Sequence, residues 1–408
     1  MNRRRFLVGA SAGAAAATLA GCDMSFRQGV FNSCAPALPT ALLQQPLLTA
    51  AWRGIDPKEV WDSHVHVFGS GDSGSGAWFN PRMEKIWRAQ QYVQRKMYIN
   101  AGCVDDQPGR VDASMTARLL AQCDAVPPGF HAILLAFDWA RDEAGTVMQE
   151  QSTFYVPDTW VAALAARHPQ RLAWAASIHP YDPAALDRLN KAAALGACAV
   201  KWLPTAQGMD PASPRCDRFY ARMAALRLPL ISHAGDERAV TGFSDALGNP
   251  LKLRRPLDAG VRVVVAHCAS LGMGRDLDQP DGAMTSNFSL FARLMDTPKY
   301  KGLVSGDISA VTQGNRMEVL GALLARPDWS ARLLNGSDYP LPAIVPLTSL
   351  PALVDRGFLP ADAVEPLRQL REHNALMFDF VLKRSLSYRG AAFAPEVFAT
   401  RTFFARPA

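Results

Sequence analysis

The chain has 408 residues, of which 49% are hydrophobic, and its 43 basic and 37 acidic side chains give a formal net charge of +6. This charge is too small and too evenly spread to indicate a nucleic-acid partner, and we expect none. The apolar content is sufficient for one large α/β domain or for two domains of ordinary size.

An export signal is predicted at residues 1–21. Residues 3–7 (RRRFL) are similar to a twin-arginine (Tat) motif, and residues 8–20 form an apolar run that is short for a membrane-spanning helix, which needs roughly 17–25 residues. Residues 19–22 (LAGC) are similar to a bacterial lipobox, in which Cys22 becomes the acylated N-terminus, although an ordinary cleaved signal is the alternative. We therefore expect a periplasmic or other extracytoplasmic lipoprotein that is exported folded and held at the membrane through Cys22.

Residues 22–58 are rich in Pro, Ala and Leu and are predicted to form a linker with one short helix near residues 40–52. Residues 100–128 resemble an insert, which Cys103 and Cys123 flank. No two cysteines are spaced as C-x-x-C, so neither a zinc knuckle nor a thioredoxin-like site is predicted. An oxidising compartment permits disulfides, but the spacing leaves their pairing open.

Residues 60–68 are predicted to form a buried strand, because the run is apolar and β-branched and ends in a Gly/Ser stretch. Side chains alternate along a strand, so Asp62, His64 and His66 share one face. The Gly/Ser stretch at residues 69–74 matches G-x-G-x-x-G, but no helix follows it directly. We interpret it as a flexible loop over the mouth of a site.

Strand-like and helix-like runs alternate through the rest of the chain, which indicates parallel βαβ units. Between His64 and Asp338 the pattern is close in length to the roughly 250 residues of a (β/α)8 TIM barrel. We predict such a barrel at residues 59–386, with a C-terminal tail at residues 387–408; a doubly wound open sheet is the alternative. The predicted strands lie at residues 60–68, 132–137, 172–178, 197–203, 228–232, 261–266, 303–308 and 333–335.

Polar side chains stand at the ends of several of these strands, where barrel enzymes build their sites. His233 and His267 each follow a buried run, Asp338 follows the last strand, and Lys201 shares an inward face with Ala197 and Ala199. Imidazoles with a carboxylate are a ligand set for Zn²⁺ or a similar ion that leaves one position open for water.

This order of residues resembles the amidohydrolase superfamily. Residues 200–207 (VKWLPTAQ), residues 336–340 (GSDYP) and Asn374-Ala375 are similar to its "amidohydrolase-related" branch, which also contains metal-dependent non-oxidative decarboxylases of aromatic and muconate-type acids. The resemblance covers about residues 60–380. Relatives often carry a histidine at the position of Leu203, so this chain is expected to differ in a pocket contact.

The resemblance implies roles for individual residues. A single divalent cation, most simply one zinc per chain, would be bound by His64, His66, His233 and Asp338. His267 would orient or polarise the substrate, and Asp338 would also relay a proton. Further candidates for the substrate or for the surroundings of the metal are Lys201, His179 and Asp307; two-metal relatives carry a carboxylated lysine at the position of Lys201, but we expect an ammonium here.

We therefore expect a metal-dependent hydrolase. The cation would lower the pKa of its water from about 15.7 toward 7, and the resulting hydroxide would attack an ester, lactone or amide carbonyl of a small molecule. The alternatives are a non-oxidative decarboxylase of a small carboxylic acid and a binding lipoprotein without turnover. The substrate and the oligomeric state are not predicted, because specificity lies in the loops after each strand.

Overall fold

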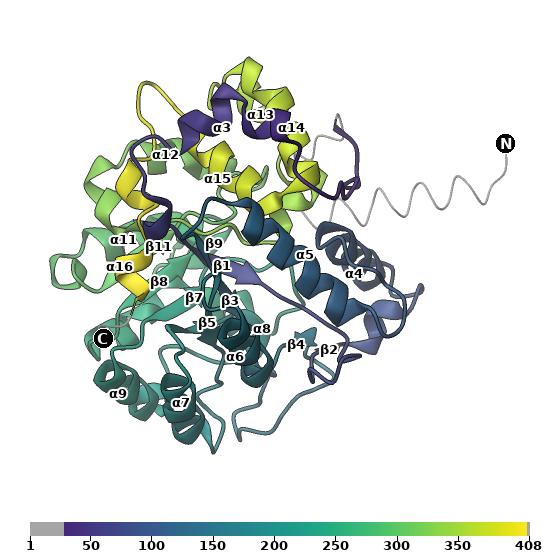
Figure 1. Ribbon diagram of the computed structural model, residues 1–408. Helices are drawn as coiled ribbons and strands as arrows, with labels where there is room; N and C mark the ends of the chain where they lie inside the picture. Colours follow the sequence, from purple (N-terminus) through teal and green to yellow (C-terminus); the bar gives the residue numbers. More distant parts are fainter. Residues whose placement is uncertain (1–27, 406–408) are drawn as a thin grey trace, which may run out of the picture.

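The computed structural model describes residues 28–405, and its centre is one sheet of eight parallel strands (Figure 1). The strands follow one another around the sheet in sequence order. Each overlaps a run that the sequence predicts to be a strand. Their bounds are β1 Trp61–His66, β3 His131–Leu135, β5 Leu172–Ala176, β6 Ala199–Trp202, β7 Leu230–His233, β8 Val263–Ala266, β11 Val304–Asp307 and β12 Leu333–Leu334.

The first strand meets the segment after the last one, which closes the sheet into a barrel. The backbone N–H of His66 donates to the carbonyl oxygen of Tyr339 at 2.9 Å. In the other direction, the N–H of Asp338 donates to the carbonyl oxygen of His64 at 2.8 Å. An open doubly wound sheet would leave these edges apart, so the predicted (β/α)8 barrel is confirmed.

Helices cover the outside of the barrel and return the chain from strand to strand (Figure 1). The first of them, α5, occupies most of the stretch that the sequence predicts as an insert; it connects β1 to β3 and therefore belongs to the barrel. The connecting helices are α5 Val111–Ala125, α6 Asp158–Arg167, α7 Ala185–Ala194, α9 Asp217–Leu226, α10 Arg254–Asp258, α11 Asn287–Asp296 and α12 Leu320–Leu324.

A second group of helices follows β12 and packs with the segment that precedes β1. Helix α15 contacts α3, and α14 contacts α2, so the helices before β1 lie beside those that follow β12 (Figure 1). The predicted linker thus contains two short helices that pack on the C-terminal part of the chain. The bounds are α2 Thr40–Leu43, α3 Pro46–Ala51, α13 Leu350–Asp355, α14 Val364–His373 and α15 Ala375–Ser385.

Alternate side chains of the strands fill the inside of the barrel. This cluster consists of Ile133, Leu135, Ala175, Cys198, Ala199, Ile231, Val264, Leu334 and Phe404. Phe404 comes from α16, Arg401–Phe404, in the predicted tail, and is 1% exposed. Lys201 and His233 lie two residues beyond Ala199 and Ile231, so they share the inward face at the carboxyl ends of their strands.

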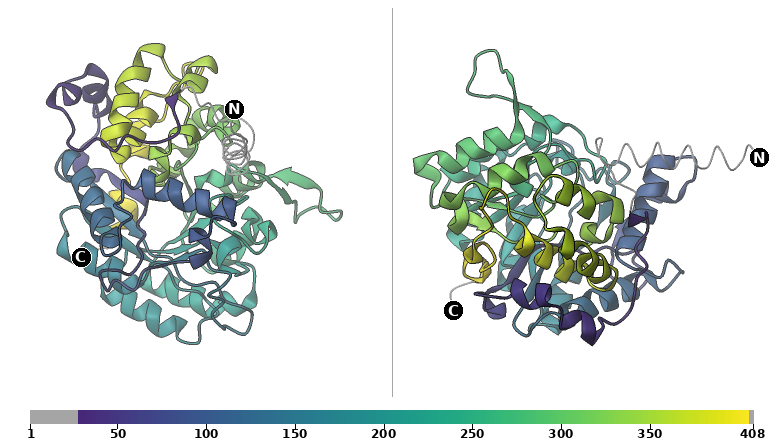
Figure 2. Two further views of the ribbon diagram at one scale, coloured as in Figure 1. Left: turned by 90° about the vertical axis from the view of Figure 1, so that its right-hand side faces the viewer. Right: turned by 90° about the horizontal axis from the view of Figure 1, so that it is seen from above.

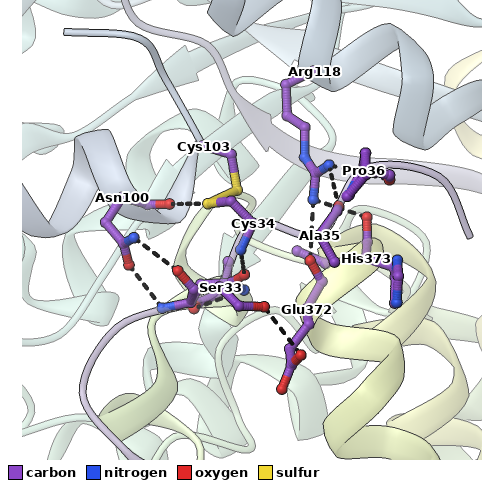
Figure 3. Close-up of a disulfide and its surroundings, with 12 residues drawn as sticks. Ser33, Cys34, Ala35, Pro36, Asn100, Cys103, Arg118, Glu372 and His373 are labelled. Atoms are coloured by element: carbon purple, nitrogen blue, oxygen red, sulfur yellow. Dashed lines mark hydrogen bonds between the residues drawn. A yellow bond between two sulfur atoms is a disulfide. The ribbon is translucent and has the colours of Figure 1, made fainter.

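A disulfide fastens the N-terminal segment to the turn that follows α4, Ala89–Ala101 (Figure 3). Cys34 pairs with Cys103 across a sequence separation of 69 residues. Cys123, the other cysteine that flanks the predicted insert, is buried and free. The Arg118 guanidinium donates to the carbonyl oxygens of Ala35 at 2.8 Å and His373 at 2.9 Å, which ties the same segment to α5 and α14.

The Gly/Ser loop after β1 is held by one carboxylate instead of being free. Asp112 on α5 accepts hydrogen bonds from the backbone N–H of Ser70 at 2.8 Å and from the hydroxyls of Ser73 at 2.8 Å and Ser75 at 2.6 Å. The interpretation of this stretch as a flexible loop is therefore wrong, because it is ordered around a buried acid.

Two short antiparallel pairs lie outside the barrel. Strand β2, Trp78–Phe79, pairs with β4, Phe154–Tyr155. Strand β9, Met273–Arg275, pairs with β10, Met284–Ser286, in a hairpin that projects from the molecule (Figure 2). Neither pair is predicted from the sequence, because both are too short to show a period of two.

Among residues 28–405, no helix is long and apolar enough to cross a membrane. The predicted Tat-type signal and Cys22 lie outside the described residues.

Candidate metal centre

Three side chains converge at the carboxyl end of the barrel. His64 and His66 lie on one face of β1, and Asp338 follows β12 in the segment that closes the barrel. The Nε2 atoms of His64 and His66 lie 3.6 Å and 3.3 Å from the same oxygen, Oδ1 of Asp338. One ligand atom from each of the three side chains lies within 4.8 Å of the others, a spacing that a single cation can bridge.

Asp307, at the end of β11, orients the His64 ring. Its Oδ2 atom lies 2.9 Å from Nδ1 of His64, and both side chains are fully buried. Because a carboxylate only accepts hydrogen bonds, Nδ1 carries the proton and Nε2 keeps its lone pair. Carboxylates that fix a ligating histidine in this way are typical of metal sites.

The same carboxylate positions His267. Oδ1 of Asp307 accepts the backbone N–H of His267 at 2.8 Å, and the ring Nδ1 lies 2.7 Å from the hydroxyl oxygen of Ser309. The His267 ring stacks on His64 with their centroids 4.9 Å apart. His267 therefore lies beside the converging residues, with Nδ1 occupied by Ser309 and Nε2 available to a substrate.

Lys201 brings a positive charge to the same place. Its Nζ atom lies 3.1 Å from Nε2 of His64, and its side chain is 1% exposed. Burial lowers the pKa of Lys201 to about 8, an effect that Asp307, Asp338 and Glu237 partly oppose. The side chain is thus predominantly an ammonium at pH 7.

His233 also lines the cavity and lies near Glu237. Its Nδ1 atom is 3.5 Å from Oε2 of Glu237, and its ring meets His267 edge-on at 5.3 Å between centroids. Within the described chain, the two groups of side chains close enough to share a cation do not include His233. Glu237 is not predicted from the sequence, since it lies in a loop with no periodic pattern.

The ionisation of these groups suits a cation. Burial lowers the pKa values of His64, His233 and His267, in the case of His233 to about 3. The rings are therefore neutral near pH 7, which is the form of imidazole that binds metals. Burial raises the pKa of Asp338, but the hydrogen bond from His66 and the charges nearby outweigh it, so the pKa falls below its usual value and the carboxylate is ionised. This donor set fits one zinc or a similar ion.

A cavity of about 360 Å³ opens above these residues. Leu203, where the resemblance predicts a changed pocket contact, lies in its wall and adds an apolar side chain there. Val30 and Phe31 also line the cavity, although they belong to the predicted linker. The other apolar lining residues are Val67, Phe68, Phe79, Val93, Met97, Phe137, Phe154, Ala239, Val240, Leu271, Pro340, Leu341, Ile344, Pro346 and Leu347.

His179 lies apart from the other predicted site residues. Its Nε2 atom lies 3.0 Å from the carbonyl oxygen of Gln207, and its Nδ1 atom accepts the backbone N–H of Tyr181 at 3.1 Å. Both ring nitrogens are thus satisfied by backbone groups, and the ring is not part of the cavity lining in the described structure. The structure therefore brings together every other predicted site residue between His64 and Asp338, but not His179.

Three comparisons relate the chain to known proteins. A family model described as amidohydrolase matches residues 61–296, and no curated protein matches the sequence. A TIM-barrel protein of Bordetella bronchiseptica is 15% identical over 75% of this chain and 94% of its own, with a TM-score of 0.45. A Pseudomonas putida protein described as a 2-pyrone-4,6-dicarboxylic acid hydrolase is 19% identical over 69% and 82%, with a TM-score of 0.43. The 5-carboxyvanillate decarboxylase of Sphingomonas paucimobilis is 12% identical over 77% and 96%, with a TM-score of 0.40.

Proposed function

Because the chain belongs to the amidohydrolase family, whose model matches residues 61–296, we propose that it is a metal-dependent hydrolase of an ester, lactone or amide of a small molecule. The observation that carries this proposal is the convergence of His64, His66 and Asp338 within 4.8 Å at the carboxyl end of the barrel. His233 faces the same cavity and is proposed as a further ligand.

One zinc per chain would supply Lewis-acid chemistry, by polarising the carbonyl and lowering the pKa of water. The chain itself supplies the proton transfer. Asp338 is ionised near neutrality, so its carboxylate accepts the proton of the attacking water and passes it to the leaving group. His267 and Lys201 lie beside His64, where they orient the carbonyl oxygen and balance developing negative charge. We propose that Lys201 acts as an ammonium and not as a carboxylated bridge between two metals.

Decarboxylation is the second candidate, since two buried cations, Lys201 and Arg316, line the cavity and suit an acidic substrate.

Hydrolysis incorporates an oxygen atom of water into the product, whereas decarboxylation does not. With the substrate in H₂¹⁸O, hydrolysis is expected to place one labelled oxygen in the product, because water is the nucleophile. Mass spectrometry measures the ¹⁸O content of the product, and an assay on the same sample measures the CO₂ released. Release of CO₂ with an unlabelled product would replace hydrolysis by decarboxylation.

We further propose that the protein is an extracytoplasmic lipoprotein held at the membrane through Cys22. The proposal is based on residues 19–22, which follow the apolar run of the predicted signal.

A Cys22→Ser variant tests this anchor. The variant is expected to move from the membrane to the soluble extracytoplasmic fraction, because a serine cannot carry the thioether-linked lipid. Cell fractionation followed by immunoblotting measures the shift, and Cys198→Ser, which alters a buried cysteine of the barrel, is the control. If the Cys22→Ser protein stays in the membrane fraction, the anchor lies elsewhere.

A further inference from the structure

The cavity contains a buried guanidinium that the proposed hydrolysis does not use. Arg316 follows β11 and lines the cavity, and its side chain is 7% exposed. Its Nη1 atom donates to the hydroxyl of Ser270 at 3.1 Å, while its Nε atom has no partner in the described structure. A buried donor without a partner costs free energy, and a ligand in the cavity that accepts a hydrogen bond from it would recover this cost.

Other buried or partly buried arginines have more partners than Arg316, although the Nε of Arg95 also lacks one. The buried Arg371 donates to the carbonyl oxygens of Val345 and Thr348. Arg188 contacts the carboxylates of Asp138, Asp158 and Asp182 at 2.7 to 3.0 Å. For Arg316, no carboxylate oxygen of the described residues lies within 4.0 Å. Arg316 is therefore a buried cation that faces the cavity without a counter-charge in contact.

The nearest acid is committed elsewhere. The Glu237 carboxylate accepts hydrogen bonds from the backbone N–H groups of Ala239 and Val240. These bonds hold Glu237 in its own loop and favour its charged form, although burial outweighs them and raises the pKa of Glu237 above its usual value. Arg316 nevertheless feels this charge, as well as that of Asp338, because both oppose the lowering of its pKa by burial.

The charges of the cavity do not cancel once a divalent cation is present. Among the buried groups in or beside the cavity, two side-chain cations, Lys201 and Arg316, lie near three carboxylates, those of Asp307, Asp338 and Glu237. Lys96 and Arg238 also line the cavity, but they are more exposed and pair with Asp106 and Asp236. A divalent cation adds two positive charges, so one positive charge remains in the buried site as long as the water there keeps its protons. Buried charge without compensation is costly, and either hydroxide or a bound monoanion would remove this cost.

We propose that Arg316 binds a carboxylate of the substrate, and that the substrate is a small apolar molecule with one such group in addition to its reacting carbonyl. This inference deepens the proposed function and rests on it. The guanidinium offers Nε and one terminal nitrogen for the paired hydrogen bonds that carboxylates accept. The apolar body of the substrate lies against the wall formed by residues such as Phe68, Phe137 and Leu203.

Binding of benzoate and benzamide to the zinc-loaded protein tests this assignment. The two probes have the same shape and differ in charge, and titration calorimetry needs no turnover. In Arg316→Gln, benzoate is expected to bind roughly 10- to 100-fold more weakly, as for the loss of a charged hydrogen bond, while benzamide changes little. Arg238→Gln is the matched control, since Arg238 lines the same cavity but is half exposed and pairs with Asp236. This control is expected to bind both probes as the wild type does.

The unfolding temperature of the Arg316→Gln variant distinguishes a binding role of Arg316 from a structural one. Because no carboxylate contacts Arg316, the Arg316→Gln protein is expected to unfold at the wild-type temperature or above it. Arg316→Lys, which keeps the charge but loses the paired geometry, is expected to bind benzoate with intermediate affinity.

Three results would overturn the proposal: no benzoate binding by the wild type, equal benzoate affinity in Arg316→Gln, or a large loss of stability in that variant. If benzoate binding is lost when zinc is removed but is unchanged in Arg316→Gln, the benzoate carboxylate binds the metal instead of Arg316. If the assignment holds but no ester, lactone or amide is hydrolysed, the proposed function fails while the binding site remains.

Discussion

An Asp338→Asn variant is expected to lose most of its zinc and roughly 10²- to 10⁴-fold of kcat/KM, the range typical of a lost general base. The asparagine keeps the shape of the side chain but removes the charge on which both His64 and His66 converge. It also removes the ionised carboxylate that we propose as the acceptor of the proton from water. Metal analysis of protein purified without added zinc measures the first effect, with about one equivalent per chain expected in the wild type.

Asp236→Asn is the matched control for this variant. Asp236 lies near the mouth of the cavity and pairs with the half-exposed Arg238, so its loss should leave zinc content and turnover nearly unchanged. Full zinc occupancy in Asp338→Asn would show that the metal is bound by other residues. Two equivalents of zinc in the wild type, falling in Lys201→Ala, would establish a two-metal site with a carboxylated lysine.

A Lys383→Met variant is expected to lose about 3–5 kcal/mol of unfolding free energy, because it breaks a buried ion pair and leaves its partner uncompensated. Lys383 on α15 is fully buried and donates to the Asp379 carboxylate and to the carbonyl oxygen of Gly336. Gly336 lies two residues before Asp338, so this pair also supports the backbone of the site. Urea denaturation measures the change, and Lys299→Met is the control, since Lys299 pairs with Asp258 in solvent.

The loss in Lys383→Met should depend on pH. Burial raises the pKa of Asp379 to about 7 from its ordinary 3.8, against the opposing effect of Lys383. A carboxyl group with a raised pKa in the folded state favours folding most fully below pH 4, and this contribution is lost as the pH rises through 7. Without Lys383 the folded-state pKa rises further, so the variant should be destabilised more at pH 8 than at pH 5. Adding Asp379→Leu to this variant should restore part of the stability. If the destabilisation does not depend on pH and Asp379→Leu restores nothing, the ion pair contributes little to stability.

Periodic patterns in the sequence predict the barrel and much of the site. The alternation along residues 60–68 places His64 and His66 on one face, and the structure confirms the strand that carries them. The ends of buried runs likewise indicate where His233 and Asp338 lie. These predictions succeed because a parallel strand that is buried on both faces has a distinctive apolar sequence, and because its carboxyl end has a known place in the fold.

Loop residues have no such pattern, so the sequence does not predict which of them reach the cavity. Glu237 and Arg316 reach the cavity from irregular segments, and nothing in their spacing indicates it. Asp307 is predicted only as a weaker candidate, because its importance depends on contact with His64, which is far away in the chain. His179 illustrates the reverse error, since a histidine after a strand can equally be satisfied by backbone groups.

The cavity wall has two parts, which are held in different ways. Lys201, Leu203 and their neighbours belong to the barrel, whereas Val30 and Phe31 belong to the segment that the disulfide between Cys34 and Cys103 fastens. Val30 and Phe31 stand only a few residues from Cys34, and in a reducing compartment its thiol would stay unpaired. Reduction of the disulfide would therefore weaken the hold on the part of the wall that contains Val30 and Phe31, and it would leave the part formed by the barrel unchanged.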